Sequence, residues 1–131
     1  TRRLVGEYVL TEQDIFDCAK FEDAIAVSAY PVDQHHPVGG DCTLMWCEDC
    51  YDVPYRSLIP KKVDSLIVAG RCLSATHLAL ASVRVMGPAM AIGEAAGKAA
   101  ALSITQGVQL RNIDVPALQQ ALLDEGVYFR D

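Results

Sequence analysis

The sequence predicts an α/β protein, because strand-like runs alternate with helical patterns along its 131 residues. The apolar run 65–69 ends at Gly70, which is typical of a strand buried on both faces. A long helix rich in alanine and glycine is expected over 88–106. An amphipathic helix over 115–125, with Asp114 at its N-cap, is expected to follow. As an isolated segment, these elements would form an α+β fold.

Segment 3–10 opens the chain with the composition of a strand and a partial alternation of apolar and polar residues. Thr11 then has the side chain of a helix N-cap, and Asp14 stands at the capping-box position three residues later. Together these two residues predict a short helix that ends near Ala19.

Residues 24–30 form the next strand-like segment, and Pro31 ends its regular pairing because proline has no N–H to donate. The pattern then breaks down over 32–52, where histidines, adjacent glycines, cysteines and acidic residues predict an irregular, cysteine-rich loop. Residues 53–59 are expected to be a short extended piece between prolines.

Three cysteines of this loop, Cys42, Cys47 and Cys50, have the spacing Cys-x4-Cys-x2-Cys. The spacing matches the first three ligands of a plant-type ferredoxin, for which Cys72 would be the fourth. The same thiols, with a histidine of the loop, would also suit zinc. The acidic residues between them favour a solvated loop, so a metal site is retained only as an alternative.

The long helix has clear signals at both ends. Gly87 is expected at its N-cap, Pro88 at the first helical position and Gly107 at its C-terminal stop. Gly93 and Gly97 lie on one face, and glycine inside a helix costs about 1 kcal/mol relative to alanine. This cost predicts that a strand, a helix or a ligand approaches that face closely. Tight packing within an ordinary core is the alternative.

Charge and composition exclude several classes of function. The formal net charge is −6, so the chain lacks the basic surface that nucleic-acid binding requires. Hydrophobic residues make up 51% of the chain, which indicates globular rather than disordered material. No apolar run is long enough to span a bilayer. Five cysteines, an odd number, favour a reducing, cytoplasmic location over a disulfide scaffold.

Six short motifs, in order along the chain, resemble the C-terminal part of an FAD-dependent oxidoreductase. Two of them read Ala69-Gly-Arg-Cys-Leu-Ser-Ala-Thr-His77 and Gly93-Glu-Ala-Ala-Gly-Lys-Ala-Ala100. The full set lies at residues 3–11, 30–35, 54–58, 69–77, 82–86 and 93–100. The subgroup that the chain resembles is bacterial, has a glutathione-reductase-type FAD domain and often lacks a defined substrate. The resemblance implies a Rossmann-like FAD-binding fold with an interleaved substrate domain, FAD as cofactor and a small-molecule substrate.

The chain departs from this pattern because it lacks the Gly-x-Gly-x-x-Gly phosphate loop. The resemblance therefore implies the C-terminal segment of a larger flavoprotein, inactive alone, with the rest of that protein as its partner. Residues 1–60 would belong to the substrate domain and residues 61–131 to the FAD-binding domain. The isolated segment is expected to self-associate through the edge of strand 65–69 or the face carrying Gly93 and Gly97.

The turn into the long helix is the flavin contact that the resemblance implies, since a helix N-terminus stabilises an anionic reduced flavin. Arg71 or Arg84 would add positive charge, although Arg71 stands where many such flavoproteins have an aspartate that holds the ribityl chain. The expected cofactor contacts are Gly70, Arg71, Ser74, Arg84, Met86, Gly87, Ala89 and Gly93. The candidates on the substrate side are Asp33 with His35, Tyr55 and His77, and His77 is preferred for its place beside the presumed flavin turn.

Less specific roles remain open for the same residues. The arginines could form ordinary ion pairs in loops, and the histidines could be solvent-exposed loop residues or structural hydrogen-bonding residues. A second function class also remains open, namely a small binding module without catalysis, stabilised by a metal at the Cys42–Cys50 loop. The sequence that precedes Thr1 in the natural gene would distinguish the two. A strand followed by Gly-x-Gly-x-x-Gly indicates the flavoenzyme, and a start codon just upstream indicates the module.

Overall fold

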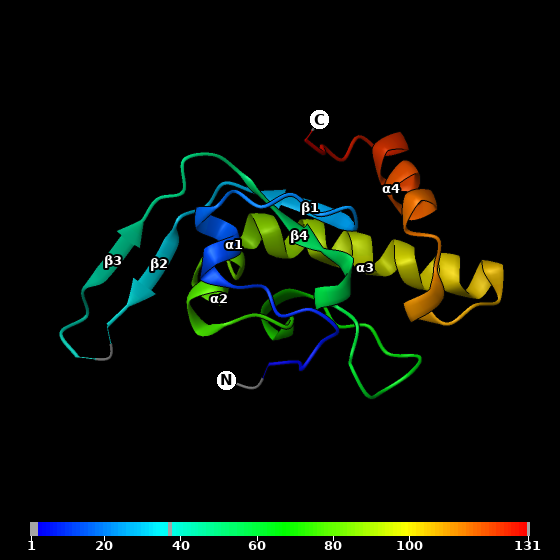
Figure 1. Cartoon of the computed structure of the whole chain (residues 1–131), viewed down its shortest axis with the longest axis horizontal. Helices are drawn as coiled ribbons and strands as arrows, with labels where there is room; N and C mark the ends of the chain where they lie inside the picture. The colour runs from blue at the N-terminus through cyan, green and yellow to red at the C-terminus, as the bar shows by residue number, and fades with distance from the viewer. Residues whose placement is uncertain (1–2, 37, 131) are drawn as a thin grey trace.

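The computed structural model describes residues 3–36 and 38–130, in which one short helix and four strands are followed by the remaining helices (Figure 1). Strand β1 (Ala24–Ser28) pairs antiparallel with β4 (Tyr51–Pro54). Strand β2 (Val32–His35) pairs antiparallel with β3 (Cys42–Met45). The α+β arrangement expected of an isolated segment is therefore present. Neither sheet is parallel, so the structure does not show the α/β layout that the alternating patterns predicted.

The capping box at Thr11 and Asp14 is confirmed and begins helix α1 (Glu12–Phe16). The Asp14 N–H donates to Thr11 Oγ1 over 3.2 Å, and the Thr11 N–H donates to Asp14 Oδ2 over 2.8 Å. The helix ends before Ala19 because Cys18 takes a φ of 51°, in the left-handed region that no helical residue adopts.

The two expected strands at 3–10 and 65–69 are wrong. Segment 3–10 forms only isolated bridges at Gly6 and Leu10, because its N–H groups bond to different segments in turn. Segment 65–69 is not buried on both faces, since Leu66 is 44% exposed. No strand of the described residues runs beside it, so the run has no ladder to join.

The loop expected over 32–52 contains a β-hairpin, formed by β2 and β3, before β4 begins. Val32 stands opposite Met45, and His35 stands opposite Cys42. Gly39 and Gly40 have φ of 98° and 72° in the turn between them, where residues with side chains are strained. The hairpin projects from one end of the molecule (Figure 1).

A short helix that the sequence did not predict, α2 (His77–Val83), precedes the long helix. Thr76 is its N-cap and accepts a hydrogen bond from the Ala79 N–H. The axis bends by 91° between α2 and the next helix, α3. No single helix of the described residues is long and apolar enough to cross a membrane, and the α2–α3 pair meets those criteria only when the two bent helices are taken together.

Helix α3 (Met86–Gln106) begins earlier than the sequence predicted. Val85 is its N-cap, so Gly87 and Pro88 lie inside the first turn rather than at the cap and the first position. Its C-terminal stop at Gly107 is confirmed, with a φ of 65°.

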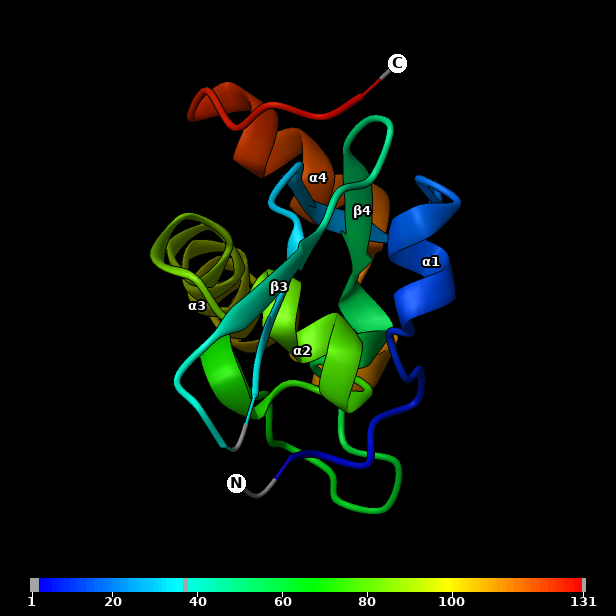
Figure 2. The same ribbon diagram turned by 90° about the vertical axis from the view of Figure 1, so that its left-hand side faces the viewer.

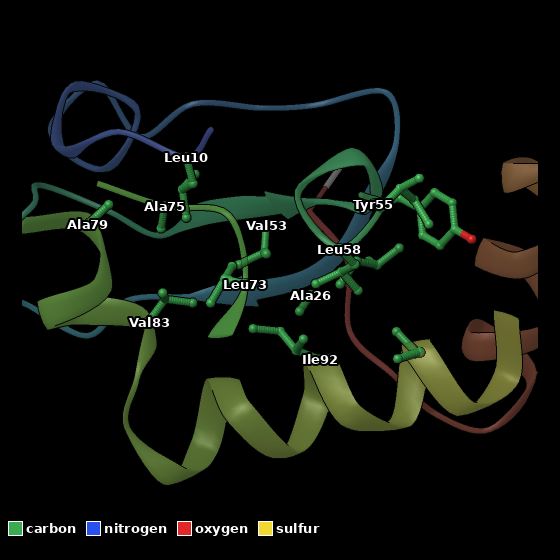
Figure 3. Close-up of a cluster of buried hydrophobic side chains, with 14 of the residues drawn as sticks. Leu10, Ala26, Val53, Tyr55, Leu58, Leu73, Ala75, Ala79, Val83 and Ile92 are labelled. Atoms are coloured by element: carbon green, nitrogen blue, oxygen red, sulfur yellow. The ribbon is translucent and has the colours of Figure 1, made fainter. Parts of the chain in front are cut away.

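The hydrophobic core lies between α3 and the β1–β4 pair (Figures 1 and 2). Ile92 points from α3 toward Ala26 of β1 (Figure 3). Helix α4 (Val115–Asp124) is confirmed: Asp114 accepts from the Ala117 N–H, and its apolar stripe is buried. The core draws side chains from both sides of residue 60. The division into domains at that residue stays a prediction.

A buried ion pair joins the C-terminal segment to β4. Arg130 Nε lies 3.0 Å from Asp52 Oδ1, and both side chains are less than 10% exposed. The same guanidinium donates to the backbone carbonyls of Cys18, Ala19 and Cys50. Because these acceptors satisfy most of its N–H groups, the charge is well compensated in its buried position.

Candidate functional site

A cavity of about 320 Å³ lies between the N-terminal segment, β2 and α2, and it collects several residues that the sequence singled out. The charged and histidine side chains along its wall are Arg3, Asp33, His35, Arg71, His77 and Arg84. Three guanidinium groups outnumber one carboxylate, so the cavity is positive in a protein whose net charge is −6. We call it the basic cavity.

Asp33 organises one side of the basic cavity. Its Oδ2 lies 3.2 Å from His35 Nε2 and 4.0 Å from Arg84 Nη2. Arg84 is the C-cap residue of α2, and its Nη2 also donates to the Asp33 carbonyl over 3.1 Å. Strand β2 and the end of α2 are therefore fastened together beside the cavity, and Arg84 and His35 are held in place by the same residue.

Arg71 and His77 also line the basic cavity, but no ion pair or hydrogen bond from a described residue holds their side chains in place. Arg71 lies in the 3-10 helix Gly70–Cys72, and His77 is the first residue of α2. Both side chains are exposed, and neither makes a hydrogen bond or ion pair within the described part of the chain. These two groups are thus free to meet a ligand in the cavity.

The N-terminus of α3 adjoins a second, shallower cavity of about 490 Å³. Aromatic and apolar side chains line it together with the first turn of the helix, at Tyr30, Leu44, Trp46, Gly87 and Pro88. We call it the aromatic cavity. No side chain caps this helix end, and a side-chain carbon added at Gly87 would meet no atom within 4 Å. Sequence reasoning missed Tyr30 and Trp46 as site residues, although these two aromatic residues flank His35 and His36 in the sequence.

The remaining predicted cofactor contacts are divided between surface and core. Gly70 has a φ of 68°, and Met86 is 82% exposed at the start of α3. Ala89 is half-buried. Ser74 is fully buried, and its Oγ has no hydrogen-bond partner among the described residues. A ligand on the surface of this chain therefore reaches Gly70 and Met86 but does not reach Ser74.

Tyr55 lies in the core (Figure 3) and does not line the basic cavity that contains His35 and His77. Its hydroxyl donates to the Leu110 carbonyl over 2.8 Å. Burial raises the pKa of Tyr55 above its ordinary value. The structure thus brings His35 and His77 into one cavity and gives Tyr55 a structural hydrogen bond.

Within residues 3–36 and 38–130, no strand or helix approaches Gly93 and Gly97 closely, so the expected contact is not made by the described part of the chain. A side-chain carbon added at either residue would meet no atom within 4 Å. They belong to an exposed stripe along α3, which we call the outer face: Met86, Met90, Gly93, Gly97, Ala101 and Ile104. If a backbone or a ligand approaches these glycines, it comes from outside the described residues.

The cysteines of the hairpin region do not form a metal site in the described residues. No group of three or more histidine, cysteine or acidic side chains there is close enough to hold an ion. Burial raises the pKa of the Cys47 thiol, and burial together with a hydrogen bond to Asp49 raises the pKa of Cys50. A raised pKa lowers the thiolate fraction, which both metal binding and redox exchange require. The metal-stabilised module has no ligand set in this part of the chain.

The open end of α3, the aromatic cavity beside it and the basic cavity are features typical of a domain that binds a planar or anionic ligand. Residues 1–122 match the family model of FAD dependent oxidoreductases, and the chain belongs to this family. Its cofactor is accordingly FAD. No match to the chain is found among the curated proteins or the solved structures.

Proposed function

We propose that this chain holds the isoalloxazine and ribityl parts of FAD in a flavin-dependent oxidoreductase of the glutathione-reductase type. The rest of the parent flavoprotein would supply the phosphate loop, since the chain contains no Gly-x-Gly-x-x-Gly sequence. The observation that carries the proposal is the uncapped N-terminus of α3 beside the aromatic cavity. Without the phosphate loop, the chain alone is expected to be inactive.

The chemistry of the helix end fits a flavin. Met86 and Gly87 lie in the first turn, where backbone N–H groups have no acceptor within the helix. The helix dipole adds partial positive charge, which favours an anionic ring. Trp46 and Tyr30 offer the flat apolar surface against which such a ring stacks. When bound, FAD supplies the hydride chemistry, and these residues orient it and bias its charge.

The substrate side of the proposal is the basic cavity. His77 is the residue that we expect to exchange a proton with the substrate, because its ring is exposed and makes no hydrogen bond within the described residues. His35 is expected to orient the substrate, since Asp33 already holds its Nε2. Tyr55 is left out of this role because its hydroxyl is buried and bonded to Leu110.

The partner in the proposal is the remainder of the same flavoprotein. Segment 65–69 carries strand-forming residues that have no neighbouring strand in the described chain. The outer face of α3 exposes glycines and methionines that ordinarily pack against something. Both features are accounted for if the FAD-binding sheet of the parent protein covers them.

The visible absorption spectrum tests the cofactor assignment. We expect the protein from the full natural reading frame to show oxidised-flavin bands that dithionite bleaches, and the 131-residue chain alone to be colourless after incubation with FAD. A colourless full-length protein would contradict the assignment. A stoichiometric flavin complex of the isolated chain would contradict the claim that its site is incomplete.

Flavin fluorescence tests the position of the ring. Aromatic stacking quenches flavin emission, so Trp46→Leu is expected to increase it in the full-length protein. Tyr128→Leu is the matched control, because Tyr128 is 69% exposed and lies outside the aromatic cavity. Equal emission from the Trp46→Leu variant and the unmodified protein, at equal flavin content, would place the ring elsewhere.

A further inference from the structure

The basic cavity has a chemical character more specific than substrate binding in general. In a chain with 17 acidic and 11 basic residues, three arginines meet around a space of about 320 Å³. This volume lies at the small end of the range for ligand pockets, roughly 300–1,000 Å³. The occupant that fits is therefore a small anion rather than a nucleotide or a protein segment.

The positive charges in the cavity are not all compensated by other groups in the described part of the protein. Asp33 is the one carboxylate that the described residues place in the wall; its Oδ2 is engaged by His35 and Arg84, and its buried Oδ1 has no hydrogen-bond partner among them. Arg3 donates one bond, from Nη1 to the Ala75 carbonyl over 2.8 Å. Arg71 makes no hydrogen bond or ion pair within the described residues. The positive charge that remains lies mainly at Arg71, with further N–H groups of Arg3 and the exposed His77 ring beside it.

We propose that the basic cavity binds the carboxylate of a small organic acid, and that Arg71 is its principal contact. The proposal rests on the proposed function, because it names the substrate class of that enzyme. A guanidinium presents a planar pair of N–H donors that matches the two oxygens of a carboxylate. Inorganic phosphate also binds a guanidinium through two oxygens, but it is tetrahedral and carries no carbon chain, so the two anions are compared directly by experiment.

Isothermal titration calorimetry on the protein from the full reading frame tests the proposal, with three probes: glutarate, its neutral diamide and inorganic phosphate. Glutarate is expected to bind at least about tenfold more tightly than the diamide, the difference that a charge-assisted contact provides. Arg71→Gln is expected to weaken the binding of glutarate by about tenfold or more, and Arg71→Lys is expected to weaken it by less.

Lys62→Gln is the matched control, since it removes one positive charge from an exposed side chain outside the cavity. We expect it to change glutarate affinity by less than about twofold. Equal losses in Arg71→Gln and Lys62→Gln would overturn the proposal, as would unchanged binding in Arg71→Gln. Tighter binding of phosphate than of glutarate would overturn the choice of carboxylate.

The calorimetric result is independent of the cofactor assignment, because heat of binding is measured whether or not flavin is present. The flavin content of the same sample is read from its absorption spectrum. A protein that contains flavin but does not bind glutarate would overturn the carboxylate site and would not affect the flavin proposal. A colourless protein that binds glutarate through Arg71 would support the site and overturn the flavin position.

Discussion

The two faces of α3 are both made of small and apolar residues, but their surroundings are opposite. The inner face carries Ile92, Ala95 and Ala99, all fully buried beside the β1–β4 pair. The outer face carries Met90 and Ile104, which are 73% and 82% exposed, and Gly93 and Gly97, which meet no neighbouring atom. A pattern of small and apolar residues therefore indicates contact without showing whether the partner lies in the same chain.

The difference between the two faces has an energetic consequence. Burial of apolar surface stabilises a fold by about 25 cal/mol per Å², and the outer face receives none of this within the described structure. Glycines there lower the helix propensity of α3 without a compensating contact. The outer face thus lowers the stability of the isolated chain. In our proposal, this face is the contact with the rest of the parent flavoprotein.

The largest expected effect on stability comes from truncating an isoleucine on the inner face, compared with an isoleucine on the outer face. Ile92→Ala should lower the free energy of unfolding by about 2–5 kcal/mol, because it leaves a cavity in the core. Ile104→Ala is the matched control and should change it by less than about 0.5 kcal/mol, because that side chain is already in solvent. Urea unfolding of the isolated chain measures both. Similar losses in the two variants would mean that Ile104 is buried in solution.

A smaller effect is expected on self-association of the isolated chain through the outer face. Met90→Glu should weaken association by at least about tenfold, because a carboxylate would be buried without a partner. Leu123→Glu, on the exposed side of α4, should leave association unchanged. Sedimentation velocity across a concentration series measures it. A monomer at every concentration, before any substitution, would remove the outer face as a contact surface.

The signals that predicted the fold correctly are local ones. Thr11 with Asp14, Asp114 and Gly107 each act within four residues of their own position, so the sequence alone located these three helix ends, although it placed the start of α3 too late. The prediction of a strand over 65–69 failed because a strand is defined by the strands that pair with it, and none of the described strands pairs with this segment. Helix α2 was missed because seven residues are too few to display a helical period.

The candidate site shows the same limit. Arg71, Arg84, His35 and His77 were singled out separately, and the structure brings them to one cavity. Arg3 and Trp46 were not assigned to the site, because their participation depends on how the hairpin and the N-terminal segment fold back onto α2 and α3. No spacing along the chain encodes that convergence.

The smallest expected effect is also the one that separates the two faces most directly. Gly97→Ala should stabilise the isolated chain by about 0.5–1 kcal/mol, because alanine favours a helix and the added methyl group meets open space. In the full flavoprotein the same methyl would fall at the contact with the partner, so the variant should be less stable there and should hold less FAD. Ala101→Gly, on the same face, controls for helix propensity and should lower stability in both forms. If Gly97→Ala stabilises both proteins equally, nothing approaches this glycine, and the outer face is ordinary surface.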